Sequence, residues 1–242
     1  MPMTTGIKKT VKASKRLVSI CDSLGELYSE NFGVQYTKIM TGSTIKAENI
    51  IANDSKKISF IGNTSLNRWK SMRDIADTID LINNETESNY EFVYYGKESS
   101  YLQGYKGIQY GGFLNPEQVH KVMHESCALI HTETFDKEYR ERLRYSVSTK
   151  IADTLASGNC LFAYGPKEIA SIEHLIENEC AVVATRKEDL KIALKSALED
   201  SELKVKVSAK AIEAAQKYHN SIKNSNLLKK VLQETMENND NL

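Results

Sequence analysis

From Lys57 onward, short apolar runs alternate with longer segments whose apolar residues recur at helical spacing. The apolar runs are continuous more than alternating, which is typical of strands that helices cover on both faces of a sheet. We therefore predict an α/β domain with a doubly wound parallel sheet. The expected strands are Ile58–Gly62, Tyr90–Tyr95, Ile108–Tyr110, Ala128–Thr132, Cys160–Tyr164 and Ala181–Thr185.

The segments between these strands are amphipathic, and several carry signals that begin or end a helix. Asn115-Pro116 supplies an N-cap residue followed by proline at the first helical position, and Gly158 stands where a helix should stop. The expected helices are Trp69–Asn83, Pro116–Glu125, Thr149–Ala156, Ile169–Asn178 and Lys187–Leu198.

Two flanking regions do not fit into this domain. Before it, a strand (Arg16–Cys21), a helix (Ser23–Asn31) and a second strand (Tyr36–Met40) form one β-α-β unit. A unit of this size cannot bury both faces of its sheet alone. After the domain, Ser201–Tyr218 and Ile222–Glu237 form a long helical tail that is interrupted between them.

Composition and charge exclude some classes of function. The 242 residues are 40% hydrophobic, and 32 Lys and Arg balance 32 Asp and Glu. This balance argues against nucleic-acid binding, which favours a clearly basic domain. No apolar run approaches the ~20 residues of a transmembrane helix, and the start lacks the hydrophobic core of a signal peptide. We therefore expect a cytoplasmic protein with no transmembrane segment.

The four cysteines (Cys21, Cys127, Cys160 and Cys180) are far apart and form no C-x-x-C pair. Cys127 and Cys160 open apolar runs, so buried free thiols are favoured over disulfides. Free thiols are typical of a reducing compartment, which agrees with the cytoplasm.

The loops after the strands are the places to search for chemistry, because ligands of open parallel sheets bind at the carboxyl ends of strands. Neither G-x-G-x-x-G nor G-x-x-x-x-G-K-[ST] occurs in the sequence. Ser148 and Thr149 fit the N-cap of a helix whose free N–H groups favour an anion. Lys150 adds a positive charge, and Asp153 lies one turn onward, so that both can face one ligand. The same residues also fit a capped surface helix with an ion pair.

Two further loops carry candidate ligand-binding residues. Gly62-Asn63 ends the first strand of the domain and leads to Arg68, whose guanidinium can pair with phosphate oxygens. Gly111-Gly112 follows a short strand and precedes Phe113-Leu114, and paired glycines let a ligand approach the backbone closely. A turn that begins the next helix explains the first loop equally well, and an ordinary βα turn explains the second.

Three other features are weaker candidates. His120 and His124 have the spacing of two metal ligands, but no third ligand follows at sensible spacing, so polar helix surface is the favoured interpretation. His131 ends a strand, where it can line the same cleft or be an ordinary strand residue. The densely charged stretch 133–144 predicts a mobile, solvated insertion.

Taken in order, these stretches resemble the retaining GT-B glycosyltransferases of the bacterial polysaccharide and lipopolysaccharide class. Asp153-Thr154-Leu155-Ala156-Ser157-Gly158 is similar to the second half of that family's glutamate signature, with Asp for Glu. Ser148–Asp153 looks like the Pro-Ser-Lys-x-x-Asp variant of some subfamilies. Gly62 matches the glycine of the family's Gly-Arg-Leu, whereas Asn63 replaces the arginine and Arg68 stands at the position of a following lysine.

The resemblance implies the donor-binding C-terminal domain of a two-domain enzyme, preceded by a truncated N-terminal domain. The implied boundaries are 1–44 for the remnant of the acceptor domain, 45–56 for a linker, 57–218 for the nucleotide-sugar-binding domain and 219–242 for a C-terminal crossing helix. Tyr145 stands where the signature's first glutamate would be, which leaves the donor sugar open.

The implied function is transfer of a sugar, with retention of anomeric configuration, from a nucleotide-sugar donor to a glycan or lipid-linked acceptor in surface polysaccharide synthesis. Arg68 and Lys150, the catalytic candidates, would stabilise the departing diphosphate together with helix N–H groups at Ser148–Thr149. Asp153 would hold ribose hydroxyls, and Gly111–Leu114 would seat the base. The arrangement requires no metal and no other cofactor.

Alternatives from another class stay open. In the main alternative, the chain is a non-catalytic nucleotide-sugar-binding subunit or remnant that needs a separately encoded N-terminal domain. Its unpaired surfaces favour self-association. We expect the isolated chain to be poorly active, since the acceptor-binding half is missing. A further alternative is an α/β regulatory domain of receiver or flavodoxin type. It is disfavoured because the sequence lacks the clustered acidic pocket or the phosphate loop that those folds use. The inner face of the membrane is an alternative location within the cytoplasm.

Overall fold

The computed structural model describes residues 5–43, 45, 49–51 and 53–237. Its main part is one sheet of parallel strands in the order β5-β4-β3-β6-β7-β8, which confirms the predicted doubly wound α/β fold. Each strand lies within about one residue of its predicted bounds. The strands are β3 (Lys57–Ile61), β4 (Glu91–Tyr95), β5 (Ile108–Tyr110), β6 (Ala128–Thr132), β7 (Leu161–Tyr164) and β8 (Val182–Ala184).

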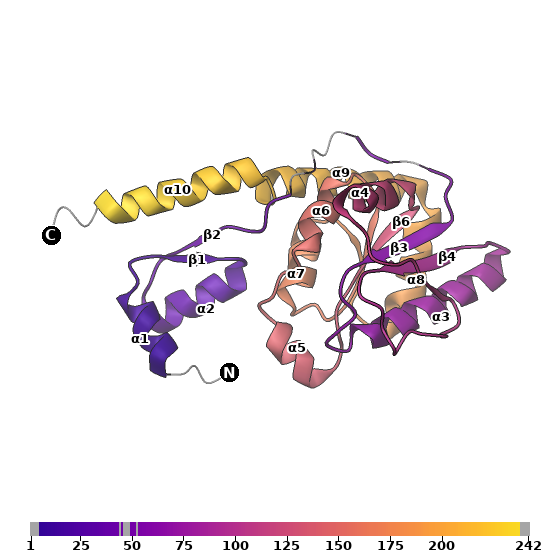
Figure 1. Cartoon of the computed structure of the whole chain (residues 1–242), viewed down its shortest axis with the longest axis horizontal. Coiled ribbons are helices and arrows are strands. Elements are labelled where there is room, and N and C mark those ends of the chain that lie inside the picture. The colour runs from indigo at the N-terminus through magenta and orange to yellow at the C-terminus, as the bar shows by residue number, and fades with distance from the viewer. Residues whose placement is uncertain (1–4, 44, 46–48, 52, 238–242) are drawn as a thin grey trace.

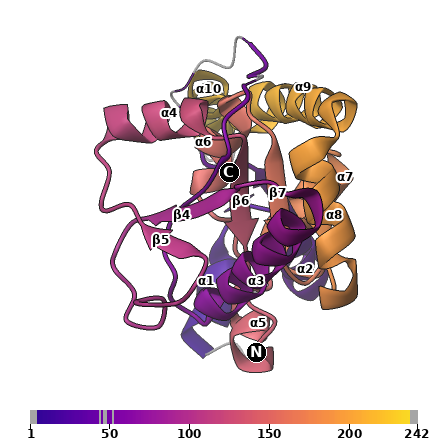
Figure 2. The same ribbon diagram turned by 90° about the vertical axis from the view of Figure 1, so that its right-hand side faces the viewer.

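Helices cover both faces of this sheet, because successive strand residues point to opposite sides and both sets are apolar. Ile58, Phe60 and Ile130 pack under α3 (Arg68–Thr86) and α8 (Lys187–Glu199), whereas Leu129 and Leu161 pack on the opposite face. Figures 1 and 2 show the two helix layers with the sheet between them. The helices of the second layer are α4 (Pro116–Glu125), α6 (Lys150–Ala156), α7 (Ala170–Glu177) and α9 (Ser201–Tyr218).

Two helices were not predicted. α5 (Lys137–Leu143) lies inside the stretch expected to be a mobile, solvated insertion; it is a regular helix with exposed charged side chains, and its mobility stays a prediction. The Asp136 side chain caps α5 by accepting from the Glu138 N–H at 3.2 Å, and Leu143 is buried in the core. α1 (Thr5–Ala13) precedes the first strand and is fixed by the buried Val11. Both helices are short, and one apolar or aromatic pair at i, i+4 spacing in each (Ile7 and Val11, Tyr139 and Leu143) is little helical periodicity to read.

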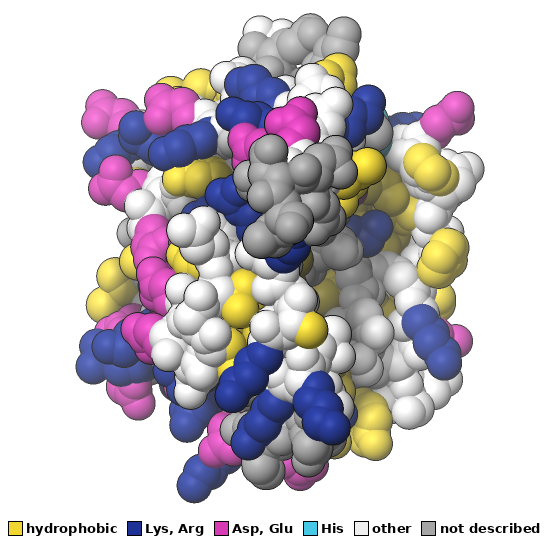
Figure 3. Space-filling view, turned by 90° about the vertical axis from the view of Figure 1, so that its left-hand side faces the viewer, with side chains coloured by type: hydrophobic (Ala, Val, Ile, Leu, Met, Phe, Trp, Pro, Cys, Tyr) yellow, Lys and Arg dark blue, Asp and Glu magenta, His cyan; other side chains and the backbone are white. Residues whose placement is uncertain are grey.

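The N-terminal residues form the predicted β-α-β unit. β1 (Leu17–Ser19) and β2 (Tyr36–Lys38) pair in parallel, and α2 (Asp22–Phe32) connects them. The unit is too small to bury all of its apolar side chains: Val18 is 49% exposed and Ile20 is 40% exposed. Figure 3, which views this end of the molecule, shows hydrophobic side chains at the surface among Lys and Arg side chains.

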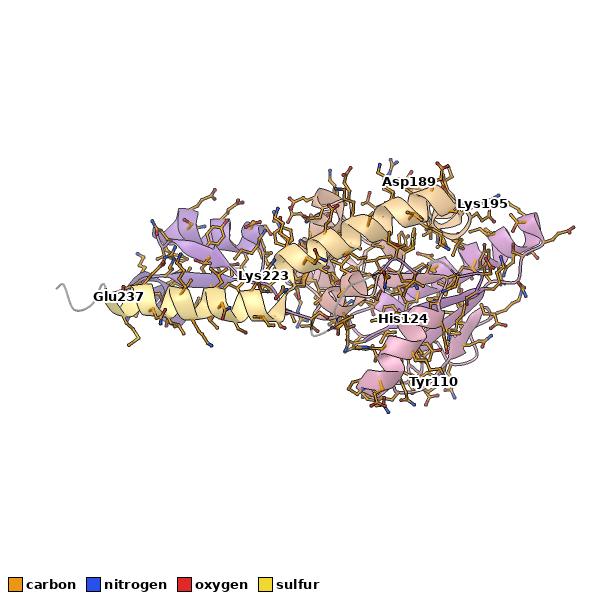
Figure 4. All side chains as sticks on the ribbon, turned by 90° about the horizontal axis from the view of Figure 1, so that it is seen from above. Tyr110, His124, Asp189, Lys195, Lys223 and Glu237 are labelled. Atoms are coloured by element: carbon orange, nitrogen blue, oxygen red, sulfur yellow. The ribbon has the colours of Figure 1, made fainter. Side chains whose placement is uncertain are left out.

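α10 (Ser221–Glu237) runs beside this N-terminal unit, as Figure 4 shows between Lys223 and Glu237. Arg16 Nη1 lies 3.0 Å from Glu234 Oε2, and Asn224 Nδ2 donates to the Met40 carbonyl at 2.8 Å. Val231 is the one residue of α10 that is buried among those described. The helix therefore contacts the unit along a narrow stripe, while Leu228, Leu232 and Met236 remain exposed.

The chain passes between the N-terminal unit and the main sheet at two neighbouring segments, residues 40–43 and 218–224. The Ser43 N–H donates to the His219 carbonyl at 2.7 Å, and Ser43 forms a parallel bridge with Asn220. A Cβ on Gly42 would lie 2.5 Å from Ser221 Cα, so only glycine permits this approach. The break that the sequence predicts near Tyr218–Ser221 is therefore a packed crossing.

A directed chain of hydrogen bonds lies inside this crossing. The Thr41 carbonyl can only accept, so His219 donates to it from Nδ1, over 2.8 Å. Nε2 of the neutral His219 ring then accepts from Nε2–H of His174, at 3.1 Å, and His174 Nδ1 faces Asn178 Nδ2 at 3.3 Å. Both rings are buried, and the order of donors fixes the tautomer of each. Protonating either ring removes an acceptor from this chain.

All four cysteines are buried and unpaired, which confirms the prediction of free thiols. Burial raises the pKa of Cys160 and of Cys180 to about 12, and it also raises the pKa of Cys127. Because the thiolate is the nucleophilic form, these groups are unreactive near neutral pH. They act as small apolar residues of the core.

We expect folding stability to fall on mild acidification because of the His174–His219 pair. Burial, and then the neighbouring His219, lower the pKa of His174 to about 3, against about 6.5 in an unfolded chain. The unfolded state therefore takes up the proton first, so this stability is present above about pH 6.5 and is lost as pH falls toward 3. Between about pH 7.5 and about pH 5.5 the loss is about 1–2 kcal/mol for His174.

Urea unfolding at the two pH values measures this loss. In His174→Asn the acid-dependent loss shrinks by about that amount, whereas the exposed His124→Asn on α4 leaves it unchanged. An equal acid loss in wild type and His174→Asn would contradict the assignment.

Candidate functional site

The strand order places the ligand-binding position of this fold between β3 and β6. To one side of β3 the chain winds to β4 and β5, and to the other side it continues to β6, β7 and β8. Loops leave in opposite directions at such a reversal, so a crevice forms at the carboxyl ends of the two strands. A cleft of about 500 Å³ lies there, lined by residues that follow β3, β4 and β5, by the last residues of β6 and by the beginning of α6.

Glycines hold the first wall of this cleft together. The Gly62 N–H donates to the Tyr95 carbonyl at 3.0 Å, and the Gly96 N–H donates to the Gly112 carbonyl at 2.9 Å. Gly96 has a φ of +139°, and a Cβ there would lie 2.3 Å from the Gly62 oxygen. Only glycine therefore allows the loops after β3, β4 and β5 to lie against one another.

The charged side chains that line the cleft are all basic. They are Arg68 at the start of α3, Lys97 after β4 and Lys150 at the start of α6, and the described lining residues include no carboxylate. Lys150 is exposed and makes no ion pair with the described residues. With an uncompensated lysine on each side, the cleft favours an anionic ligand.

Arg68 is held by a buried carboxylate behind the cleft wall. Its Nε and Nη2 lie 2.9 and 2.8 Å from Glu133 Oε2, and the Glu133 side chain is 2% exposed. Ser171 Oγ donates to Glu133 Oε1 at 3.1 Å. Burial by itself would raise the pKa of Glu133, but the adjacent His131 ring and the Arg68 guanidinium hold that pKa below its usual range. The carboxylate is therefore ionised and fixes the guanidinium in place.

The residues predicted at the beginning of α6 lie in the cleft. Ser148, Thr149 and Lys150 all line it, together with Thr154 one turn onward. Thr149 is the N-cap residue of α6, as expected, but its backbone is helical and its side chain makes no capping hydrogen bond. Its hydroxyl is thus not committed to the helix.

Asp153 lies differently from what its spacing suggests. Its Oδ1 accepts from Ser43 Oγ at 2.8 Å, and Asp153 is absent from the residues that line the cleft. The structure therefore does not bring Asp153 and Lys150 onto one ligand position, since Asp153 faces the crossing segment. A contact between Asp153 and a ribose stays a prediction and requires that the bond to Ser43 be exchanged.

The two remaining predicted loops form the rim. Gly62, Asn63, Phe113 and Leu114 line the cleft, and Phe113 is 81% exposed. Asn63 Oδ1 accepts from the Ser65 N–H at 2.8 Å, which leaves the amide nitrogen of its side chain for a ligand. Gly112 is not a lining residue; with a φ of +90°, it shapes the turn that presents Phe113.

Two residues of the cleft were missed or undervalued by the sequence reasoning. Lys97 follows Gly96 directly after a predicted strand, so its position at a carboxyl end was a usable signal. His131, the weaker candidate, lines the cleft and is 9% exposed. His120 and His124 are exposed on α4, and His124 marks that helix in Figure 4. Within the described ranges, no three His, Cys, Asp or Glu side chains gather as a metal site would need.

In the part of the chain that the structure describes, no helix is both long and apolar enough to cross a membrane. No curated protein matches the sequence. Several solved structures are similar in fold. The chain matches WaaG, a glycosyltransferase involved in lipopolysaccharide biosynthesis, with a TM-score of 0.60 and 13% identity over 83% of this chain. It spans 58% of the length of WaaG.

Two further structures are similar. A glycosyltransferase from Rickettsia africae has a TM-score of 0.74 and 11% identity, over 98% of this chain and 69% of the other. Anabaena HepE, solved with UDP and glucose, has a TM-score of 0.65 and 11% identity, over 93% of this chain and 67% of the other. At these identities the likeness shows the GT-B fold alone.

The sequence, in contrast to the fold, identifies a family. The pattern of the family described as "Glycosyl transferase-like" matches residues 73–229, which is more than half of the chain and includes β4 through α9. The matched range contains Lys97, the Phe113–Leu114 rim and the beginning of α6, so it covers most of the cleft. The chain therefore belongs to the glycosyl transferase-like family.

Proposed function

We propose that the cleft binds the nucleoside diphosphate part of a nucleotide sugar, and that the chain is the donor-binding portion of a retaining glycosyltransferase. The observation that carries this proposal is the charge of the cleft: Arg68, Lys97 and Lys150 line it without a carboxylate among the described lining residues. A site of this charge at the switch point of a parallel sheet suits a diphosphate. HepE, which has the same fold, was solved with UDP and glucose.

Each group of residues at the cleft has its own role in this proposal. Arg68 at the start of α3 and Lys150 at the start of α6 both line the cleft, and in this proposal they stabilise the negative charge that grows on the departing diphosphate. Ser148 and Thr149 offer hydroxyl and backbone donors beside Lys150. On the rim, Phe113-Leu114 and the turn at Gly112 seat the base, and Gly62-Asn63 closes the wall near the phosphates. Asp153 is retained as the ribose ligand of the proposal.

We propose the acceptor only by its chemical class, as a glycan or a lipid-linked molecule. The transfer would serve surface polysaccharide synthesis at the cytoplasmic side. WaaG, with the same fold, is involved in lipopolysaccharide biosynthesis. The alternative is a non-catalytic nucleotide-sugar-binding subunit that needs a partner chain. The exposed Val18 and Ile20 of the N-terminal unit favour this alternative, because exposed apolar surface marks an interface.

Calorimetric titration with UDP, GDP, ADP and dTDP tests nucleotide binding. We expect at least one to bind, and Lys150→Ala to weaken that binding by about 1.5 kcal/mol, roughly tenfold in Kd, because a hydrogen bond to a charged group is lost. Lys229→Ala, on the exposed part of α10, is the matched control and leaves Kd unchanged. No heat with any of the four nucleotides would overturn the proposed function.

Salt dependence separates phosphate contacts from base contacts. Because Lys97 and Lys150 are exposed, their attraction to a diphosphate is screened as the Debye length falls from about 10 Å at 0.1 M to about 3 Å at 1 M salt. We expect the Kd of the diphosphate to rise across this range, while the Kd of the corresponding nucleoside, which binds more weakly, changes little. Equal affinity for nucleoside and diphosphate would move the ligand away from the lysines.

Sugar transfer by the chain alone is expected to be slow. Holding donor and acceptor in register can lower a barrier by ~7–11 kcal/mol, and the N-terminal unit offers only two strands for an acceptor. The measurement is transfer from nucleotide sugars to candidate acceptors, with and without the products of neighbouring genes. Rapid transfer by the chain alone contradicts this expectation, whereas transfer only with a partner supports a split enzyme.

A further inference from the structure

His131 is a buried polar side chain whose ring nitrogen is unpartnered. It lies on β6 at a position of the same parity as Leu129, which places it on the face covered by α4 and α6, where the cleft lies. The residue is 9% exposed, and its Nε2 is buried without a hydrogen-bond partner. Burying such a group without a hydrogen bond is unfavourable, so the position calls for an explanation that packing does not supply.

The nearest group to this nitrogen is the carboxylate that also holds Arg68. His131 Nε2 lies 3.5 Å from Glu133 Oε1, beyond a well-formed hydrogen bond, while Arg68 occupies Oε2 of the same side chain. One buried carboxylate thus faces two side chains that line the cleft. It can orient both, and it can stabilise a positive charge on the imidazole as well as on the guanidinium.

The charged groups around the imidazole come from every wall of the cleft. Arg68 on α3, Lys97 after β4 and Lys150 on α6 line the same cleft and are positive, and Glu133 after β6 is the carboxylate that lies against the ring among the described residues. An anion bound in this cleft is attracted more strongly to a protonated imidazole than to a neutral one, so that protonation of the ring and binding of the anion favour one another.

We propose that His131 is a diphosphate-binding residue of the cleft, whose imidazole takes up a proton when the nucleoside diphosphate binds, with Glu133 as the positioning residue for both His131 and Arg68. The inference rests on the proposed function and adds to it a pH-sensitive contact. In chemical terms, the imidazole gains a proton from solvent on binding and returns it on release, and no covalent bond forms or breaks.

The test compares wild type with His131→Gln, which keeps a polar side chain of similar length but cannot become charged. The tightest-binding of UDP, GDP, ADP and dTDP is titrated at about pH 6 and about pH 8.5, a range that spans the usual titration of histidine. We expect His131→Gln to weaken binding about tenfold at the lower pH and much less at the higher pH. Calorimetry in buffers of different ionisation enthalpy should also show fewer protons taken up by the variant.

Two further variants make the result specific. His124→Gln, exposed on α4, should match wild type at both pH values. Glu133→Gln should weaken binding and reduce the proton uptake, since both side chains lose their anchor. The nucleoside without phosphates should bind wild type and His131→Gln equally, because it offers the imidazole no anion.

The outcomes separate this inference from the proposed function. If wild type binds a nucleoside diphosphate and His131→Gln binds it equally at both pH values with equal proton uptake, the inference is overturned and the proposed function stands. If wild type binds none of the four nucleotides, the proposed function and the inference fall together. A loss that is the same at both pH values, without a change in proton uptake, assigns His131 a structural role and also overturns the inference.

Discussion

The reversal of winding between β3 and β6 is the constraint on which the rest of the site depends. A parallel sheet with both faces buried can present polar groups only where its strands end. The reversal opens one place at that edge where two loops part and leave room for a ligand. In this chain the residues that follow β3, the last residues of β6 and the beginning of α6 supply walls of the cleft. Its position is thus set by strand order before any side chain is considered.

Two of the buried polar clusters each hold separate segments of the chain together. Behind the cleft, Glu133 joins the end of β6 to α3 through Arg68 and to α7 through Ser171. At the crossing, the chain from Asn178 to Thr41 runs through two imidazoles. Buried polar groups of this kind must be satisfied together, which makes each arrangement more specific than an apolar contact of the same area.

Much of the fold was readable in the sequence, because strand runs and helix caps are local signals. The Asn115-Pro116 start and the Gly158 stop are examples, and the helices they bound were predicted correctly. The rim and the beginning of α6 followed from the same logic, as loops after strands. The ion pair between Arg68 and Glu133 did not, since its partners are 65 residues apart and neither lies in a recognisable motif.

The direction in which a side chain points was the other feature that the sequence did not predict. Lys150 and Asp153 have the spacing of neighbours on one helix face, yet one lines the cleft and the other bonds to Ser43. A seven-residue helix covers about two turns, so a small rotation about its axis decides which side chain enters the cleft. That rotation is set by tertiary packing of Ile151 and Leu155, which the sequence alone does not place.

The double crossing at residues 40–43 and 218–224 restricts how the N-terminal unit can move against the main sheet. Two adjacent covalent connections, bonded to each other through Ser43 and His219, exclude sliding and leave rotation about an axis near Gly42. Displacement in such a rotation grows with distance from the axis. In Figure 1 the crossing lies at the top of the gap and α5 at its lower end. The weak contact of Cys21 Sγ with the Tyr145 carbonyl, at 3.6 Å, also joins the two parts, so a rotation that moves them apart has to break it.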